Sequence, residues 1–511
     1  MIVVVAVPSA RIPAWHGWCI DALRREPALE VRVVAVPGGR ASEPGRGVAA
    51  RWAGKALAAV DVTLDAGDVT GADLVIDLTG DRVPAGARHG VWSFQLGEAE
   101  DAGLPFAREI AAGRRTFDTV LARRIGGTST RLRTGRFAVT RWYPTTVRLA
   151  LAETARWPAT LAAALTAGAE LPGVAGEAAA GGPLTALERL RFATSLGKRV
   201  GAAISTALFD VAEWNVGFVE GGAARLLSAA PLDVHWLPRP EPFTYIADPF
   251  VAERDGVRAL FVESFDYQNE RGVIDALVLD DADRVVRRAR VIDIDTHLSY
   301  PYPVEIDGEL YLVPENCSGN EVALYRCVSF PDRWERECAL FPAFDGVDTT
   351  LFAHEGRWWA FCTRYSRGST LALNAFYADS PRGQWSPHAL NPIVVDVSSA
   401  RPGGQPFTVD GTLYRPGQDC SDSYGGALAI ARVDELTPTA YRETIVQRHG
   451  ARAFGRWNAG IHTASFTRGR IVVDGKHVYR DPRKLPGAVR RLAARIGTLF
   501  GRRPAKEATF A

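Results

Sequence analysis

Two aspartates, Asp248 and Asp348, occupy equivalent places in a repeated pattern of the chain. Each stands eight residues before a turn glycine, Gly256 or Gly356, where a buried strand is expected to begin. A single aspartate in such a place more often caps a turn. Two carboxylates in register around one axis instead indicate a functional site, because acid–base chemistry needs ionisable groups that share a pocket. We therefore expect both side chains in one pocket that solvent reaches.

The repeat that contains these aspartates predicts a five-bladed β-propeller. Five glycines, spaced 52, 48, 55 and 58 residues apart, each precede an aromatic or aliphatic run, and four of them follow an acidic residue. An acidic residue and a glycine between apolar runs are a strong hairpin signal. A hairpin that recurs about every 50 residues is typical of propeller blades. The turn glycines are Gly256, Gly308, Gly356, Gly411 and Gly469.

Further polar residues are expected near the same axis. Glu263 and Glu315 are predicted to end the innermost strands of blades one and two. The remaining polar set is denser than a structural hub requires and is typical of a binding site. For each arginine alone, an inter-blade salt bridge is the alternative. The predicted substrate-binding residues are His297, Ser299, Tyr300, Arg401, Arg415, Gln418, Asp419 and His462.

The length and composition of the chain predict several parts rather than one core. Residues 1–150 alternate strands and helices, as in an open, Rossmann-like α/β sheet, and residues 151–212 form an Ala-rich helical linker. Residues 213–480 hold the propeller repeats, and residues 481–511 form a basic tail. In this tail, residues 487–503 predict an amphipathic helix that either contacts a membrane surface or docks on the protein itself.

Three segments of the first domain, Asp73–Asp77, Gly90–Glu98 and Phe117–Leu121, resemble the folate-dependent formyltransferase fold. The H-x-S-x-L-P-x-x-R-G loop of that family is absent, so no base for formyl transfer is visible. We expect a degenerate domain, with a sugar formyltransferase as the weaker alternative. The first strand is followed by Pro8–Arg11 rather than by G-x-G-x-x-G, so no dinucleotide site is expected.

Long runs of the second half resemble the N-terminal domain of glucosamine inositolphosphorylceramide transferases, over about residues 240–475. The matching runs include His297–Tyr302, Phe330–Trp334, Ser380–Trp385, Arg401–Phe407 and Leu413–Cys420. This resemblance implies a part in glycan or glycolipid assembly.

The same half also resembles the five-bladed glycosidases of the arabinanase and β-xylosidase type. In that resemblance Asp248 matches the general base or nucleophile, and Asp348 matches the aspartate that orients and tunes a partner acid. The run Ala400–Pro406 stands where the family's acidic Glu is expected. Since glycoside hydrolysis needs a proton donor, Glu263 or Glu315 becomes the candidate acid.

The net charge and the cysteine spacing argue against a nucleic-acid-binding protein and against a metal site. The net charge of +2 favours no nucleic-acid partner. The six cysteines show no C-x-x-C spacing, so we expect no metal, no other cofactor and reduced thiols. The N-terminus lacks a secretory leader. We therefore expect a cytoplasmic, bacterial protein, peripheral at the inner face of the membrane if the tail binds lipid.

These observations predict a carbohydrate-active protein of surface-glycan or glycolipid biosynthesis. Its propeller would bind a sugar, a glycolipid or a nucleotide-sugar and would transfer or cleave a glycosyl group. The alternative is a non-catalytic glycan-binding or scaffold protein, in which both domains have lost their chemistry.

Overall fold

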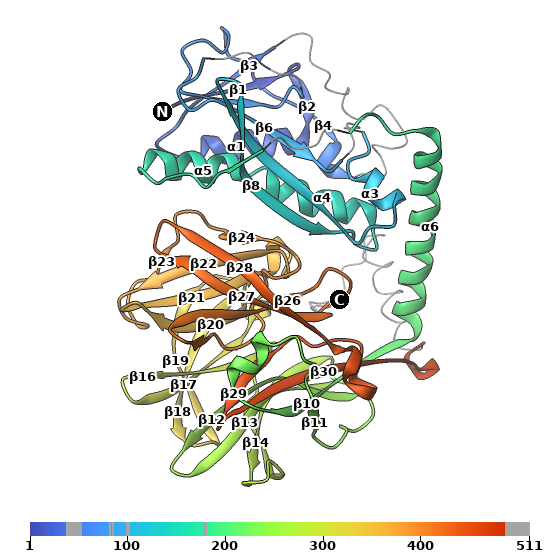
Figure 1. Ribbon diagram of the computed structural model, residues 1–511, viewed down its shortest axis with the longest axis vertical. Helices are drawn as coiled ribbons and strands as arrows, with labels where there is room; N and C mark the ends of the chain where they lie inside the picture. The colour runs from blue at the N-terminus through green and yellow to red at the C-terminus, as the bar shows by residue number, and fades with distance from the viewer. Residues whose placement is uncertain (37–53, 81–82, 84–85, 99–102, 177–180, 486–511) are drawn as a thin grey trace. The chain divides into compact units, whose positions relative to one another are not determined.

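The computed structural model describes residues 1–36, 54–80, 83, 86–98, 103–176 and 181–485 (Figure 1). The chain divides into two compact units. Unit 1 contains residues 1–200, 388–396 and 437–441, and unit 2 contains residues 201–387, 397–436 and the chain from residue 442 onward. The division after residue 200 falls within a helix.

Unit 1 is built on one mixed sheet of seven strands in the order β3-β1-β5-β6-β7-β8-β9. The strands β3, β1, β5 and β6 are parallel, whereas β7, β8 and β9 are added antiparallel to their neighbours. The strands are β1 (Ile2–Val7), β3 (Glu30–Ala35), β5 (Leu74–Asp77), β6 (Val91–Leu96), β7 (Thr116–Ile125), β8 (Thr128–Ala138) and β9 (Val174–Ala175). A separate pair joins β2 (Arg11–Pro13) to β4 (Ala59–Asp61).

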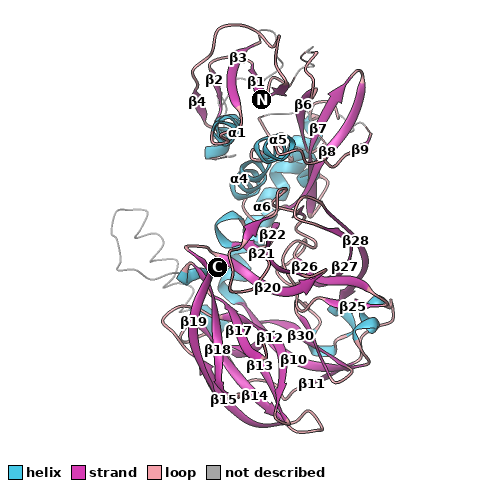
Figure 2. Ribbon diagram, turned by 90° about the vertical axis from the view of Figure 1, so that its left-hand side faces the viewer, coloured by secondary structure: helices cyan, strands magenta, loops and turns pink. Residues whose placement is uncertain are grey.

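Helices pack beside this sheet and cover its apolar strands (Figure 2). Helix α1 buries Trp15, Cys19 and Leu23 on one face, as helical periodicity requires. Two further helices carry a proline in their first turn, where its missing N–H costs no hydrogen bond. The helices are α1 (Ala14–Arg24), α3 (Ala107–Ala111), α4 (Tyr143–Thr154), α5 (Trp157–Thr166) and α6 (Ala186–Phe209). Unit 1 is therefore an α/β domain with a mixed sheet, and its likeness to formyltransferases stays a prediction.

Unit 2 is a five-bladed β-propeller, as the repeat predicts. Its sheets each contain a run of four antiparallel strands. The predicted hairpin turns are all present, and both of their central residues have positive φ, for example 52° at Asp255 and 77° at Gly256. The least typical turn has the same geometry, with 36° at Arg468 and 78° at Gly469. Such turns match the twist of the flanking strands and therefore favour tight hairpins.

The first strands of the blades face the axis, since β12 contacts β16 and β29, and β16 contacts β20. Blade one contains β12 (Thr244–Arg254), β13 (Val257–Asp266), β14 (Arg271–Leu279) and β15 (Val285–Ile292). Blade two contains β16 (Ser299–Ile306), β17 (Glu309–Glu315), β18 (Glu321–Ser329) and β19 (Arg333–Pro342). Blade three contains β20 (Gly346–His354), β21 (Arg357–Arg364), β22 (Ala372–Ala378) and β23 (Ser386–Pro387). Blade four contains β25 (Phe407–Val409), β26 (Thr412–Asp419), β27 (Ala427–Leu436) and β28 (Tyr441–Gly450).

Blade five is assembled from the two ends of the propeller. Its order is β29-β30-β10-β11, in which β29 (Ala464–Thr467) and β30 (Arg470–Arg480) come from the end of the domain. The strands β10 (Asp210–Glu220) and β11 (Val234–Trp236) come from its beginning. The strand β10 pairs with β30 over eleven residues, from Asp210↔Arg480 to Glu220↔Arg470. This pairing closes the ring and leaves no open edge between the first and last strands.

Candidate functional site

Three axial residues, Asp248, Tyr300 and Asp348, are placed by the same backbone irregularity. Each lies in a register shift of the first strand of its blade, between Ala247 and Phe250 in blade one. Each has a left-handed conformation, with φ of 51°, 45° and 51°. A β-bulge of this kind re-aims a side chain at a sheet end and costs backbone strain. Its recurrence in three blades marks this end of the axis as the candidate site.

The bulged residues join neighbouring blades through carboxylates. The backbone N–H of Asp248 donates to Asp474 Oδ2 of blade five at 3.2 Å, and that of Tyr300 donates to Asp248 Oδ2 at 3.3 Å. The N–H of Asp348 donates to Glu315 Oε2 of blade two at 3.2 Å. Each carboxylate thus satisfies a buried donor of the following blade, which unsatisfied would cost free energy.

Asp348 is held by an arginine and an amide from blade four. Arg401 donates Nε to Asp348 Oδ2 at 2.6 Å and Nη2 to Oδ1 at 3.1 Å, and Gln418 Nε2 donates to Oδ2 at 2.7 Å. Glu315 Oε2 lies 3.5 Å from the same Arg401 Nη2. The Arg401 guanidinium lies over the Tyr424 ring, 5.0 Å from its centroid. This fork is the geometry in which arginine fixes a carboxylate most firmly.

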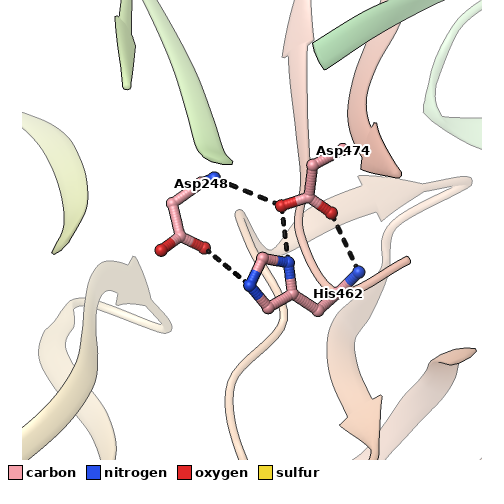
Figure 3. Close-up of side chains that lie close together, drawn as sticks. All are labelled: Asp248, His462 and Asp474. Atoms are coloured by element: carbon pink, nitrogen blue, oxygen red, sulfur yellow. Dashed lines mark hydrogen bonds and ion pairs between the residues drawn. The ribbon is translucent and has the colours of Figure 1, made fainter. Parts of the chain in front are cut away.

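Asp248 belongs to a second cluster, with residues of blade five (Figure 3). Its Oδ1 accepts a hydrogen bond from Thr463 Oγ1 at 2.7 Å and lies 3.6 Å from His462 Nε2. The other ring nitrogen, His462 Nδ1, lies 2.5 Å from Asp474 Oδ2. The imidazole stacks on Trp214, with ring centroids 4.0 Å apart.

Glu263 forms a third cluster, with residues of blade one and the loop before blade two. Tyr245 donates its hydroxyl to Glu263 Oε1 at 3.2 Å, and His297 Nε2 lies 3.5 Å from the same oxygen. His297 Nδ1 accepts the N–H of Gly272 at 2.8 Å, so the neutral ring carries its proton on Nε2 and presents it to Glu263. Burial lowers the pKa of His297 to about 4, which keeps the ring neutral at pH 7.

Burial raises the pKa values of three carboxyl groups of the site, but by different amounts. Burial raises the pKa of Asp248 to about 6, with His462 opposing the rise and Asp348 adding to it. Burial and the Asp348 charge raise the pKa of Glu315 to about 8. Burial and Asp248 raise the pKa of Glu263 well above its ordinary value. At pH 7, Asp248 is therefore largely ionised, while Glu315 largely holds its proton.

The cluster is nearly closed to solvent. The exposed fraction is 3% for Asp248, 1% for Asp348 and 8% for Glu315. Tyr424, which touches both Arg401 and His462, is 44% exposed. The solvent-facing boundary of the site therefore includes this tyrosine.

The structure brings most of the predicted site residues together, but not all. Arg415 pairs with Glu443 inside blade four through two hydrogen bonds of 2.6 Å, so it is a salt bridge within one blade. The inter-blade salt bridge considered for each arginine is found instead at Arg401, which pairs with Asp348 of blade three. Asp419 pairs with Arg448 at 2.7 Å, away from the axial carboxylates. Ser299 is buried opposite Glu315 in the strand register.

One strand assignment is wrong. Glu263 and Glu315 lie on β13 and β17, which are the second strands of their blades and not the innermost ones. Glu263 and Glu315 each stand seven positions after the turn glycine of their blade, and every other blade has a residue at the same position. These equivalent positions are Glu263, Glu315, Thr363, Gln418 and Lys476.

Sequence reasoning missed several residues of the site. Asp474 follows Ile471–Val473 in a strand that is otherwise apolar at that point, and a carboxylate in a buried run was the signal that could have revealed it. Lys476 lies on the same strand and donates to Ser423 Oγ at 3.3 Å and to the carbonyl of Tyr424. Trp214 comes from β10, far from the other site residues in sequence.

Among the described residues, one group has the composition of a metal site. One ligand-type atom each from Asp248, His462 and Asp474 lies within 4.8 Å of the others. These atoms already bond to one another and to backbone N–H groups. We therefore interpret the three as an ionic cluster and not as metal ligands.

The fold and the axial cluster define a five-bladed propeller with a polar centre. Most of this propeller matches one protein family. Residues 237–461 match the family described as Glucosamine inositolphosphorylceramide transferase 1, N-terminal. The resemblance inferred from the sequence is thus confirmed for this domain, and the protein is related to glycan-handling proteins.

Two plant relatives carry the same name. Glucosamine inositolphosphorylceramide transferase 1 of Oryza sativa subsp. japonica is 35% identical over 211 residues, which are 40% of this chain and 28% of that protein. The Arabidopsis thaliana protein is 34% identical over 211 residues, with the same shares. The match covers only 28% of each relative's length.

Solved structures of similar fold include RS223-β-xylosidase, with a TM-score of 0.33 and 16% identity over 42% of this chain and 80% of that chain. A GH43_1 enzyme from Xanthomonas citri has a TM-score of 0.34 and 12% identity over 50% of this chain and 91% of that chain. Likeness at this level assigns no activity to the chain.

Two expectations about the source and location are corrected. The expected cytoplasmic location, at most peripheral to a membrane, is wrong, because the relatives are plant proteins named glucosamine inositolphosphorylceramide transferase 1. The expected bacterial origin has no support from these plant relatives. The predicted tail helix, residues 487–503, lies outside the described residues. Within the part of the chain that is described, each helix is too short or too polar to cross a membrane.

Proposed function

We propose that the propeller binds a glycosyl group at the axial cluster and transfers or cleaves it. The observation that supports this is the difference in pKa between two axial carboxyl groups. Asp248, with a pKa of about 6, is a base at neutral pH, and Glu315, with a pKa of about 8, is an acid. Paired carboxyl groups whose environments separate their pKa values are the requirement of acid–base chemistry at a glycosidic bond.

In this proposal Asp248 is the general base or nucleophile, and Glu315 donates the proton to the leaving oxygen. Asp348 influences both groups, since its negative charge raises the pKa of Asp248 and the pKa of Glu315. Glu263 is the second candidate acid, since its pKa is raised by burial and by Asp248, and it is contacted by Tyr245 and His297. The substrate class is a sugar, glycolipid or nucleotide-sugar, in keeping with the names of the relatives.

Saturation-transfer difference NMR tests binding, with glucosamine, N-acetylglucosamine, xylose, arabinose and galactose presented to the full chain. Turnover is followed with the matching 4-nitrophenyl glycosides and nucleotide-sugars. We expect one sugar to bind and its glycoside or nucleotide-sugar to react. Asp248→Asn and Glu315→Gln should each lower turnover at least about a hundredfold, while the surface control Asp332→Asn should keep it. Turnover that survives both axial substitutions contradicts the catalytic assignment.

A second function, a non-catalytic glycan-binding scaffold, is favoured by one observation. Asp348 has an exposed fraction of 1%, and its two carboxylate oxygens are occupied by Arg401 and Gln418. A carboxylate paired in this way serves to hold blades together. Sugar binding without any turnover, unchanged in Glu315→Gln, supports the scaffold, whereas the absence of binding to every sugar contradicts both functions.

A further inference from the structure

Asp474 is a buried carboxylate whose bonds are all made inside the site. Its Oδ1 accepts the N–H of His462 at 2.9 Å and that of Thr463 at 3.1 Å, and its Oδ2 accepts the N–H of Asp248 at 3.2 Å. It has no exposed surface. The geometry therefore fixes the carboxylate in one orientation, with Oδ2 directed at His462 Nδ1.

His462 is held between this carboxylate and Asp248. Trp214 stacks on one face of the ring with an interplanar angle of 19°, and the Tyr424 ring meets it edge-on at 5.4 Å. Its Nε2 faces Asp248 Oδ1 at 3.6 Å. A ring fixed on both sides cannot turn, so its two nitrogens keep their separate partners (Figure 3).

We infer that Asp474 and His462 form a positioning pair for Asp248: Asp474 holds a protonated imidazole whose other nitrogen faces the Asp248 carboxylate and keeps that carboxylate ionised. The inference rests on the proposed function, since it concerns the group that would attack or activate the substrate. His462 and Asp474 are buried and contact Asp248, so their part in this inference is to orient and tune that carboxylate.

The charges around the ring support a protonated imidazole. Burial alone lowers the pKa of His462, but Asp474 and Asp248 outweigh it, and the pKa is raised above its ordinary value. Lys476, on the same strand β30 as Asp474, has its ammonium over Trp214, 5.2 Å from the ring centroid. Burial lowers the pKa of Lys476 to about 8, so its positive charge weakens above that pH. Asp348, from β20, acts on the ring as a further negative charge.

The pair also explains how Asp248 stays ionised in a buried place. Burial raises the pKa of Asp248, and His462 is the largest effect that opposes this rise. Removal of the imidazolium charge would leave burial, Asp348 and Asp474 acting together. Asp248 would then take up a proton at neutral pH and lose its capacity as a base.

The test is a pH titration of the nine histidines of the full chain by NMR of their ¹⁵N-labelled rings. His462→Gln identifies the resonance. We expect His462 to remain protonated well above pH 6.5 and to lose its proton at least about one pH unit lower in Asp474→Asn, since one unit corresponds to a tenfold change in proton affinity. Asp332→Asn, which removes a surface partner of Arg287, is the matched control and should leave the midpoint unchanged.

Three outcomes overturn the inference: a neutral His462 at pH 7 in the unaltered protein, a midpoint that Asp474→Asn does not move, or displacement of the ring proton by micromolar Zn²⁺ or Ca²⁺. The titration needs no substrate, so its failure is separate from failure of the proposed function. If a glycoside is turned over, the acidic limb of the kcat/KM profile should move to higher pH in His462→Gln, because the charge that opposes the rise in the pKa of Asp248 is lost. A purely structural role of His462 would leave that limb in place.

Discussion

Arg401 and Asp348 are joined by a two-pronged ion pair, from Nε to Oδ2 at 2.6 Å and from Nη2 to Oδ1 at 3.1 Å, that connects blades four and three at the propeller axis. Both side chains are almost wholly buried. A buried ion pair of this kind contributes only modestly to the free energy of unfolding. Loss of one partner, however, leaves the other charge buried and uncompensated, which is strongly destabilising.

Separate substitution of the two partners should therefore destabilise more than joint substitution. We expect Arg401→Met or Asp348→Asn to lower the free energy of unfolding of the propeller by about 3–5 kcal/mol. The double variant should recover part of that loss. Urea denaturation of the full chain measures it, with Arg287→Ala at the half-exposed Arg287–Asp332 pair as the control, expected to cost at most about 1 kcal/mol. Equal costs at the two pairs would contradict this account of Arg401.

Two glycines with positive φ should respond differently to alanine. Gly404 has a φ of 122°, and a Cβ there would lie 1.9 Å from the carbonyl oxygen of Ala464. Gly256 has a φ of 77° with open space around the same atom. We expect Gly404→Ala to cost at least about 3 kcal/mol and Gly256→Ala about 1 kcal/mol, because only the first adds a backbone clash to the conformational strain. Thermal unfolding of both variants decides this, and a reversed order would be inconsistent with the structure.

The Tyr300 hydroxyl connects three blades. It hydrogen-bonds to Thr350 Oγ1 at 2.8 Å and accepts the N–H of Gly404 at 3.0 Å. Tyr300→Phe should cost about 1–3 kcal/mol, because it leaves buried polar groups unsatisfied. Tyr302→Phe is the control: Tyr302 is equally large and buried, and its hydroxyl makes no hydrogen bond to a described residue, so a smaller loss is expected. Equal losses in urea denaturation would show that ring packing, and not the hydroxyl, is being measured.

Glu315 should make the propeller less stable as the pH rises. Its pKa is about 8 in the folded chain and 4.5 without the fold, so the folded state binds the extra proton. Its contribution is complete below pH 4.5 and is lost as the pH rises through 8. Glu315→Gln, which cannot ionise, should reduce the fall in unfolding free energy between pH 5 and 9 by a few kcal/mol, as an order of magnitude. The exposed Glu335→Gln should leave the fall as it is, and an unchanged fall in Glu315→Gln would contradict the raised pKa.

The sequence was enough to predict the propeller because its hairpin turns are local. An acidic residue and a glycine with positive φ leave a signature in adjacent residues, and the repeat of that signature predicts the blades. Asp248 and Asp348 could be paired for the same reason, since each keeps a fixed distance from its turn.

The partners of those aspartates could not be predicted in the same way. His462 and Asp474 meet Asp248, and Trp214 meets His462, only because the ring closes. The pairing of β10 with β30 that closes it joins residues more than 200 positions apart. The burial of Asp348 behind Arg401 likewise depends on how blades three and four pack. Arg415 looked equivalent to Arg401 in sequence, and only the fold shows that it faces Glu443.

Blade five determines when the axial cluster can form during synthesis of the chain. Asp248 is made early in the propeller, yet the residues that hold it, His462 and Asp474, belong to its last blade, and β30 must find β10 at the far end of the domain. Until that moment Asp248 has neither its imidazole nor the carboxylate that receives its backbone N–H. A propeller without its last blade therefore lacks these contacts of Asp248, since completion of the ring and completion of the axial cluster are a single event.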